Sequence, residues 1–269
     1  MSQTYIVFDV GHTRTKIGTF HLQGKDQLPE CVMTRSIFNT EEIPWSDLKE
    51  WFRSPDLSLI TLTGSNRNMI EELKNQWPED VPPPHLLTSK SQIPIQVKVD
   101  APEKVGADRL FNAVAARLFQ ESPSSMIIID SGTAATVDAV SEDGTFLGGA
   151  ILPGILMGVK ALHELTTTLP LVDARQFLKK TPTAIGRNTE DAMSSGLFWG
   201  HLGAIREVVS RVQSELQGNP QLFLTGGALP ILEPYFPEAI CHPDLSLIGI
   251  VLTASQLSSS RDESSESAQ

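Results

Sequence analysis

The chain has 269 residues, of which 40% are hydrophobic and 20% are charged, and its formal net charge at pH 7 is -11. This length allows one large domain or two of ordinary size, and the composition is that of a globular protein. The acidic balance argues against a general nucleic-acid or anionic-membrane surface, because such surfaces need clustered lysine and arginine. A small anionic ligand is not excluded, since a local site can oppose the charge of the whole chain.

Cysteine usage and the chain ends give further expectations. Cys31 and Cys241 are the two cysteines, and they lie far apart without metal-ligand spacing, which indicates reduced thiols in a cytoplasmic protein. No signal peptide is expected at the N-terminus, and no run approaches the ~18 consecutive apolar residues of a membrane span. Residues 258–269 are small and polar, and they are predicted to form a disordered tail.

The first part of the chain alternates between strand-like and helix-like segments. Apolar runs rich in β-branched and aromatic residues predict strands at 4–11, 15–22, 31–38 and 57–64. Helices are predicted at 45–52, 66–77 and 106–119. Ser46 is a candidate cap for the first of these helices, and the proline-rich residues 78–85 form a loop.

A similar succession begins again after the turn at 122–125. Strands are predicted at 126–130, 135–140 and 221–227, with the segment 146–154 following a turn. Helices are predicted at 155–165, 188–216 and 245–256. Hairpin strands followed by β–α alternation favour a mixed α/β fold in two lobes, residues 1–120 and 121–257.

The two lobes share a short signature at their first strands. Aligning Asp9 with Asp130, an offset of 121 residues, places Gly11 on Gly132 and Thr15 on Thr136 without gaps. A match at the start of each lobe predicts a duplicated architecture.

In both lobes a strand ends in Asp-x-Gly followed by threonine. Glycine allows a tight turn and close approach of a ligand, while backbone N–H groups and threonine hydroxyls are donors suited to phosphate oxygens. The aspartate can hold a cation, or a metal-bound water, that bridges to the phosphate. One such loop is more often an ordinary turn. Two of them are explained together by a phosphate chain held by both loops.

Other nucleotide-binding motifs are missing from the sequence. There is no GxxxxGK[ST] motif of a P-loop and no GxGxxG motif after a strand. The glycine-rich strand exit at 224–227 is either an ordinary turn or a place where the backbone approaches an adenosine. Lys16 is either a solvated hairpin lysine or a positive charge directed at the transferring phosphate.

These motifs together closely resemble those of the type III pantothenate kinase family, within the actin-like ATPase superfamily that includes sugar kinases. The family's D-x-G-N-T-x-x-K-x-G corresponds to DVGHTRTKIG at 9–18, and its G-x-D-R to GADR at 106–109. Its D-x-G-T-A-x-T-x-D corresponds to DSGTAATVD at 130–138. Its G-G-x-I-x-P-G and A-I-G-R-N-T correspond to residues 148–154 and 184–189.

The resemblance implies a fold and a reaction. The fold would consist of two similar ribonuclease-H-like lobes, with the active site in the cleft between them. The reaction would transfer phosphate from ATP to the primary hydroxyl of pantothenate, which gives 4′-phosphopantothenate, the first step of coenzyme A biosynthesis. The resemblance also implies Mg²⁺ with ATP, a monovalent cation (K⁺ or NH₄⁺) and a homodimer.

The resemblance also assigns roles to residues. Asp108, at the start of a predicted helix, is the candidate general base, a role typically worth about 10²–10⁴ in rate. Arg109 can bind a substrate carboxylate through two hydrogen bonds, and Asp130 matches the monovalent-cation ligand. The implied ATP contacts are Asp9, Val10, Gly11, His12, Thr13, Arg14, Thr15, Lys16 and Thr133. The implied substrate contacts are Gly106, Ala107, Asp108, Arg109 and Thr189.

Some of these residues also have ordinary structural interpretations. Asp108 and Arg109 are equally typical of a charged first helical turn with a surface partner. Asn188 or Thr189 can cap the helix that begins before Glu190, and capping is compatible with substrate contact.

Three positions depart from the family motifs. His12 stands where the family usually has asparagine, which changes the size and donor chemistry of the first loop. Val99 and Ala101 stand where it often has tyrosine and asparagine. A weaker or reshaped substrate pocket is therefore expected, with the same reaction.

Two further functions are compatible with the sequence. One is a kinase for another small hydroxy acid, in which Asp108 and Arg109 keep their roles. The other is a regulatory or accessory protein that binds ATP without turnover. Acceptor screening distinguishes the first, and ADP release that depends on pantothenate distinguishes the second.

Overall fold

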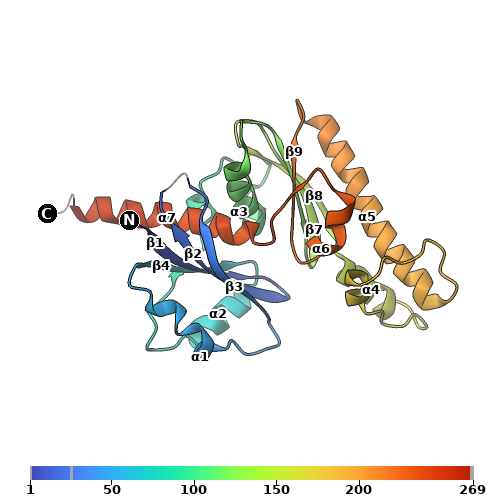
Figure 1. Cartoon of the computed structure of the whole chain (residues 1–269), viewed down its shortest axis with the longest axis horizontal. Helices are drawn as coiled ribbons and strands as arrows, with labels where there is room; N and C mark the ends of the chain where they lie inside the picture. Colours follow the sequence, from blue (N-terminus) through green and yellow to red (C-terminus); the bar gives the residue numbers. More distant parts are fainter. Residues whose placement is uncertain (1, 25–26, 267–269) are drawn as a thin grey trace. The chain divides into compact units, whose positions relative to one another are not determined.

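The computed structural model describes residues 2–24 and 27–266, with side chains to residue 258 (Figure 1). The chain forms two compact units. The first comprises Met1–Gln96, Asp100–Phe119 and Leu245–Gln269, and the second comprises Val97–Val99 and Gln120–Asp244. Each unit is an α/β structure with its own sheet and hydrophobic core.

The sheet of the first unit has five strands in the order β3-β2-β1-β4-β5. Its strands are β1 (Gln3–Val10), β2 (Arg14–Leu22), β3 (Glu30–Phe38), β4 (Leu57–Gly64) and β5 (His85–Leu86). The central strand β1 is antiparallel to β2 and parallel to β4. The strands expected from the β-branched and aromatic runs are confirmed.

The sheet of the second unit repeats this topology. Its strands are β6 (Met126–Ser131), β7 (Ala134–Val140), β8 (Phe146–Pro153), β9 (Gln221–Thr225) and β10 (Ile240–Cys241). Their order, read from β8, is β8-β7-β6-β9-β10, which matches β3-β2-β1-β4-β5 strand for strand. The duplicated architecture predicted from the two Asp-x-Gly motifs is therefore confirmed.

The register of the two hairpins corrects one detail of the ungapped alignment. Asp9 lies opposite Lys16 across β1 and β2, whereas Asp130 lies opposite Thr136 across β6 and β7. Thr136 is therefore the structural counterpart of Lys16 and not of Thr15. The reason is that the second turn has one residue fewer. An ungapped alignment therefore pairs every residue after the turn with the wrong counterpart, one position away.

The α-helices described in the first unit are α1 (Trp45–Leu48), α2 (Arg67–Asn75), α3 (Ala107–Ala116) and α7 (Leu245–Glu266). The expected Ser46 cap is wrong, because Pro44 precedes α1 without a side-chain cap and the Ser46 hydroxyl donates to Asp47 Oδ1 at 3.3 Å. Asn66 caps α2 instead, through Oδ1 and the Met69 N–H at 3.2 Å. A proline at the N-cap position offers no side-chain oxygen to the free N–H groups of the first turn of α1.

Helix α7 belongs to the first unit although it closes the chain. It packs against α3, β1 and β4, and the hydroxyls of Tyr5 and Ser258 lie 3.2 Å apart. The lobe boundary predicted from the sequence puts residues 245–257 with the second lobe, because chain order does not reveal a returning helix. Helix α7 runs to Glu266, into the segment expected to be a disordered tail, and residues 267–269 lie outside the described residues.

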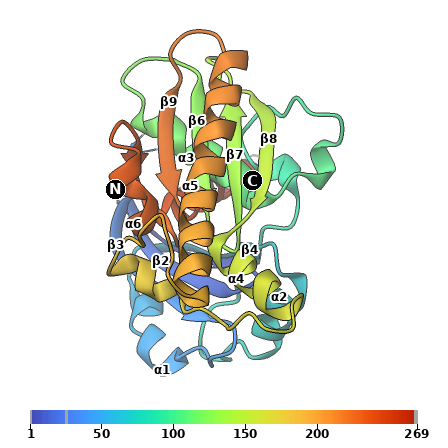
Figure 2. The same cartoon turned by 90° about the vertical axis from the view of Figure 1, so that its right-hand side faces the viewer.

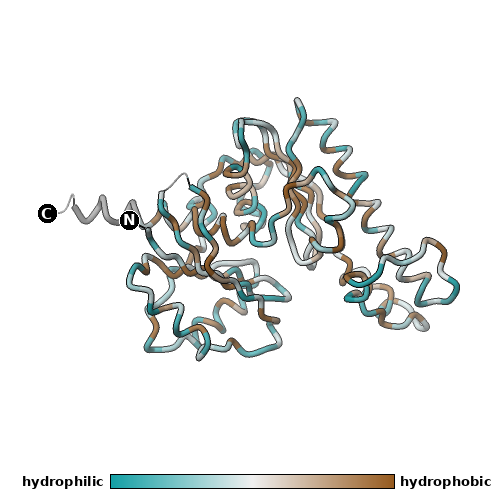
Figure 3. The backbone as a smooth tube through the Cα atoms, viewed as in Figure 1, coloured by the Kyte–Doolittle hydropathy of each residue, from teal (hydrophilic) through white to brown (hydrophobic). Residues whose placement is uncertain are grey.

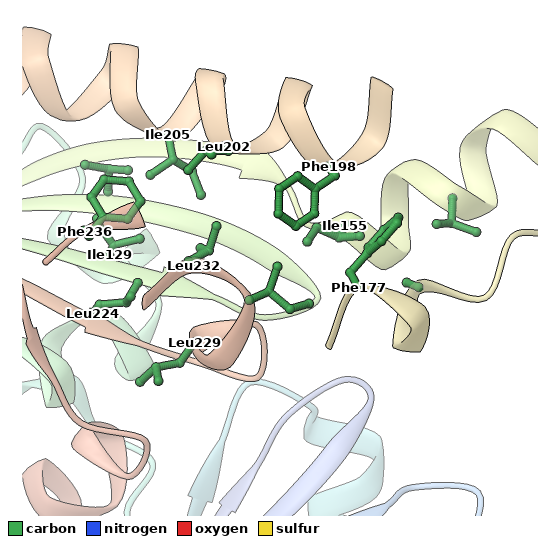
Figure 4. Close-up of a cluster of buried hydrophobic side chains, with 14 of the residues drawn as sticks. Ile129, Ile155, Phe177, Phe198, Leu202, Ile205, Leu224, Leu229, Leu232 and Phe236 are labelled. Carbon is green, nitrogen blue, oxygen red and sulfur yellow. The ribbon is translucent and has the colours of Figure 1, made fainter. Parts of the chain in front are cut away.

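The second unit contains α4 (Ile155–Glu164), α5 (Thr189–Glu215) and α6 (Leu229–Leu232). Figure 2 shows α5 lying across the face of the sheet formed by β6 and β7. Leu202 and Ile205 of α5 point toward the sheet that carries Ile129 and Leu224, and Phe198 lies beside Ile155 and Phe177 (Figure 4). The burial of this face explains why a helix of 27 residues is stable.

Hydrophobic residues concentrate along the strands of both sheets (Figure 3). In the first unit, the rings of Phe8 and Trp77 lie 5.3 Å apart and those of Trp45 and Trp77 lie 5.1 Å apart. Short 3-10 helices occur at Trp51–Arg53, Lys90–Gln92, Pro102–Lys104, Arg117–Phe119, Ala174–Leu178 and Glu233–Tyr235. Of the helices that the structure describes, none is long and apolar enough to span a membrane.

Candidate active site

The first Asp-x-Gly loop is the turn between β1 and β2. The Gly11 N–H donates to the Arg14 carbonyl at 3.0 Å, which closes the turn. Asp9 and Lys16 are directly opposite each other on the two strands, and both are half-buried. Cross-strand neighbours share one face of a sheet, so a carboxylate and an ammonium group lie together at the base of this loop.

Helix α7 anchors the aspartate of this loop. The Ser246 hydroxyl, in the first turn of α7, donates to Asp9 Oδ2 at 2.9 Å. The N-terminus of a helix carries a partial positive charge, which also stabilises a nearby carboxylate. Ser246 was not among the predicted site residues, because no motif connects residues that are separated by 237 positions.

Asn39 immediately follows β3 and hydrogen-bonds the first loop. Its Nδ2 donates to the carbonyls of Gly11 at 2.8 Å and His12 at 3.2 Å, and its backbone N–H donates to the Thr13 carbonyl at 3.0 Å. The Thr15 hydroxyl donates to Asn39 Oδ1 at 3.0 Å. Asn39 was not among the predicted site residues.

The His12 side chain has a partner of its own. His12 Nδ1 lies 3.2 Å from the Ser65 hydroxyl, which follows β4. The residue that departs from the family motif is therefore linked to the neighbouring strand exit.

Equivalent glycines lie beside both loops. Gly64 ends β4 with φ 146°, and a Cβ there would overlap the Val10 carbonyl. Gly226 follows β9 with φ 94°, and a Cβ there would overlap Asp130 Oδ1. Glycine is needed at both positions because φ is positive and a neighbouring strand exit leaves no space for a side chain.

The second Asp-x-Gly loop is the tighter turn between β6 and β7. The Gly132 N–H donates to the Ala134 carbonyl at 2.9 Å, so a single residue, Thr133, lies between the two. Thr133 is exposed and Asp130 is half-buried. The residue opposite Asp130 is Thr136, so this loop has a neutral hydroxyl residue at the position of Lys16.

A buried histidine connects α5 to the second loop. His201 Nε2 lies 3.0 Å from the Ser131 hydroxyl, and the ring also hydrogen-bonds the backbone of Pro153 at the end of β8. Burial lowers the pKa of His201, because a charged ring would lose its hydration, and the Pro153 hydrogen bond partly opposes this effect. Neither His201 nor Ser131 was a predicted site residue, and a buried histidine on an apolar helix face was the available signal.

The predicted base lies in the first turn of α3. Asp108 Oδ1 accepts a hydrogen bond from the Arg109 N–H at 3.0 Å, and the carboxylate is half-buried. Gly106 caps the helix, and a Cβ on it would overlap Asp108 Oδ1. Glycine at 106 therefore lets the carboxylate turn back over the helix N-terminus, where the helix dipole favours its negative charge.

Thr189 is the first residue of α5 and is exposed. The cap itself is Asn188, whose Oδ1 accepts from the Asp191 N–H at 2.8 Å and whose Nδ2 donates to Asp191 Oδ2 at 2.9 Å. The capping interpretation is confirmed for Asn188, which leaves the Thr189 hydroxyl at the helix start.

Val99 lies in the second unit. Its strand-like segment is held to β8 by a hydrogen bond from the Lys98 N–H to the Phe146 carbonyl at 2.9 Å. The departure from the family motif at residue 99 is therefore anchored against a sheet edge.

The predicted residues form two groups, one in each unit. The first unit holds Asp9 to Lys16 and Gly106 to Arg109, and the second holds Asp130, Thr133 and Thr189. Among the side chains that the structure describes, residues 2–24 and 27–258, no three His, Cys, Asp or Glu come together as a metal-binding group. The ligands offered at the two loops are carboxylate, hydroxyl and backbone oxygens, which are suited to hard cations.

A family model for type III pantothenate kinase matches residues 5–211. The chain belongs to the type III pantothenate kinase family. A relative from Rubrobacter xylanophilus is 33% identical over 260 residues, 90% of this chain and 94% of that protein. One from Geotalea uraniireducens is 32% identical over 245 residues, 85% of this chain and 89% of that protein. Both bear the name type III pantothenate kinase.

Other members of the type III pantothenate kinase family match more closely over a shorter stretch. The relative from Gluconobacter oxydans is 40% identical over 161 residues, 60% of this chain. This match and those to two Dehalococcoides mccartyi relatives cover 57% to 58% of the relatives' own length.

Solved structures share the fold at low sequence identity. A Campylobacter jejuni protein described as a Baf family transcriptional activator matches with TM-score 0.55 and 20% identity, over 93% of this chain and 98% of that one. The activator of 2-hydroxyisocaproyl-CoA dehydratase from Clostridium difficile, with bound ADPNP, matches with TM-score 0.53 and 14% identity, over 98% of each chain. These likenesses show the fold alone, and they cover both α/β units of the chain, as expected from the sequence.

Proposed function

We propose that the protein phosphorylates pantothenate with ATP, giving 4′-phosphopantothenate and ADP. Membership of the type III pantothenate kinase family is the observation that carries this proposal, and the two Asp-x-Gly hairpins fit it. Both units contribute residues to the proposed reaction.

The two loops bind the phosphates of ATP in different ways. Lys16, opposite Asp9, supplies a positive charge that stabilises the phosphoryl group during transfer. Asp9 is held by Ser246 and orients the lysine or a metal-bound water. Thr133, at the tip of the tighter second turn, donates its hydroxyl to a phosphate oxygen.

The oxygen ligands of both loops fit the cations that the family implies. Asp9 would contact Mg²⁺ through water, and Asp130 would bind K⁺ or NH₄⁺ directly. These cations neutralise phosphate charge, the main contribution that a kinase makes besides positioning. The absence of a lysine opposite Asp130 supports this assignment, since a neighbouring ammonium group would compete for the carboxylate.

Asp108 acts as the general base. The hydroxyl oxygen of pantothenate attacks the γ-phosphorus, the bond from that phosphorus to the bridging oxygen of ADP breaks, and the hydroxyl proton passes to Asp108. Arg109 binds the pantothenate carboxylate through two hydrogen bonds. Thr189 provides a further hydroxyl contact to pantothenate.

The active protein is a homodimer in this proposal. Support comes from large hydrophobic side chains exposed on the second unit, namely Ile151, Leu156, Met157, Leu165, Leu171, Leu178 and Ile185. Exposed apolar side chains that lie together typically mark protein interfaces, and these seven all belong to residues 151–185 of the chain. Light scattering coupled to size-exclusion chromatography measures the mass directly, and a monomer at assay concentrations would contradict this part.

The test of the reaction is ADP release with and without pantothenate and K⁺. We expect ADP release to require both, and Asp108→Asn to lower kcat by about 10²–10⁴-fold while ATP still binds. Asp56→Asn, at an exposed aspartate before β4 and outside the predicted site, is the matched control and keeps wild-type turnover.

Two results would contradict the proposal. A rate of ADP release that is unchanged by pantothenate but is increased by another hydroxy acid would identify a different acceptor. Near-normal turnover of Asp108→Asn would remove the assignment of the base.

A further inference from the structure

Asn39 hydrogen-bonds the first loop through both its side chain and its backbone, although it is not one of the predicted ATP contacts. It immediately follows β3, at the point where that strand passes the turn between β1 and β2. Its carboxamide and its backbone N–H together bind three consecutive carbonyls, those of Gly11, His12 and Thr13.

The orientation of the carboxamide follows from its neighbours. Nδ2 faces two carbonyl oxygens, and Oδ1 faces the Thr15 hydroxyl, which donates to it at 3.0 Å. The flipped amide would direct Oδ1 at two carbonyl oxygens, which repel it. Only one orientation therefore satisfies the network.

Binding these carbonyls also determines the direction of the N–H groups. In a planar trans peptide, the C=O of one residue and the N–H of the next point in opposite directions. The carbonyls of Gly11 and His12 point to Asn39, so the N–H groups of His12 and Thr13 point to the opposite side of the turn. Backbone N–H groups oriented together are the usual donors to phosphate oxygens.

We propose that Asn39 is a positioning residue for nucleotide binding, which holds the backbone N–H groups of the first loop in the direction that receives the phosphates of ATP. This proposal rests on the proposed function, because that function makes the first loop a phosphate site. Asn39 itself does not touch the substrate. Its effect reaches ATP through the peptide planes of residues 11–13.

The test compares Asn39→Ala and Asn39→Asp with Asn75→Ala, an exposed asparagine of α2 that serves as the matched control. Asn39→Asp keeps the size and the acceptor for Thr15 but directs a carboxylate oxygen at the Gly11 and His12 carbonyls. Both Asn39 variants should weaken ATP binding by about 10- to 100-fold, since both lose the hydrogen bonds to the Gly11 and His12 carbonyls. Asn39→Ala also loses the acceptor of the Thr15 hydroxyl. Asn75→Ala should bind ATP like the wild type.

Two readouts separate positioning from a general loss of stability. Calorimetric titration with a non-hydrolysable ATP analogue, below the melting temperature of each variant, measures binding to folded protein and does not depend on the acceptor. Steady-state kinetics should show a raised KM for ATP, with the KM for pantothenate changed by less than about twofold.

The outcomes are distinguishable from failure of the proposed function. If the wild type binds the analogue but does not phosphorylate pantothenate, the acceptor assignment fails and the analogue titration still decides the role of Asn39. Wild-type analogue affinity in folded Asn39→Asp or Asn39→Ala would overturn the positioning role. A wild type that does not bind the analogue would overturn both proposals.

Discussion

A single glycine controls the carboxylate proposed as the base. The Asp108 carboxylate turns back toward its own helix N-terminus and accepts from the Arg109 N–H at 3.0 Å. A Cβ at residue 106 would overlap Asp108 Oδ1, although the φ of -60° at Gly106 is one that alanine adopts without strain. Alanine at this position therefore displaces the carboxylate without straining the backbone.

Gly106→Ala is expected to lower kcat by about 10- to 100-fold, because small displacements of a catalytic group are costly. The KM for ATP should change little, since Gly106 is not an ATP contact in the proposed mechanism. Steady-state kinetics measure both values. Gly203→Ala is the matched control, because nothing lies within 4 Å of a Cβ there. Equal kcat for the two variants would argue against the proposed position of the base.

At the scale of elements, the buried imidazole of His201 connects helix α5 to the second Asp-x-Gly loop. His201 of α5 contacts both the Ser131 hydroxyl of β6 and the Pro153 backbone of β8. A neutral imidazole has one N–H, so a ring that donates to Pro153 can accept from Ser131 through its other nitrogen. Protonation would replace this acceptor with a second donor and place a charge in a desolvated position.

The lowered pKa of His201 predicts a dependence of stability on pH. The unfolded chain binds a proton near the ordinary histidine pKa of 6.5, whereas the folded protein binds it only at lower pH. The stabilisation is therefore complete above pH 6.5 and is lost as pH falls through the lower pKa of the folded protein.

Thermal unfolding between pH 7 and pH 5 measures this effect, since these values bracket the ordinary pKa. The melting temperature of His201→Gln should fall less steeply than that of the wild type. His163→Gln, at an exposed histidine of α4, should keep the wild-type slope. Parallel curves for His201→Gln and the wild type would contradict the role given to the buried ring.

At the scale of the whole molecule, the last helix completes the first unit. Seven hydrophobic residues of α7 are buried, namely Leu245, Leu247, Ile248, Ile250, Val251, Leu252 and Ala254. Burial of a leucine, isoleucine or valine side chain stabilises a protein by about 1.5–3 kcal/mol. The contribution of six such side chains is therefore comparable with the about 5–15 kcal/mol that separates a folded protein from the unfolded chain.

A chain ending at Asp244 is therefore expected to leave the first unit unfolded. A chain ending at Ser258 retains all seven buried residues and should unfold at the wild-type temperature. Circular dichroism and limited proteolysis compare the two truncations. A folded first unit in the shorter chain would show that α7 adds little to its stability.

The sequence by itself determined the strands, the two lobes and the family. The short apolar runs that end in Asp-x-Gly are local features of the sequence. They correspond to strands β1 and β6 of the structure. The motif order from 9–18 to 184–189 was sufficient for the family, because each motif keeps its residues close together in the chain.

Only the tertiary structure decided which distant residues support those motifs. Asn39, Ser246 and His201 carry no sequence motif, and each reaches its loop from another strand or helix. The equivalence of Thr136 with Lys16 likewise required the strand register, because one residue less in a turn shifts every later position. Hydrogen bonds and packing act across space, so their partners become visible only when the chain is folded.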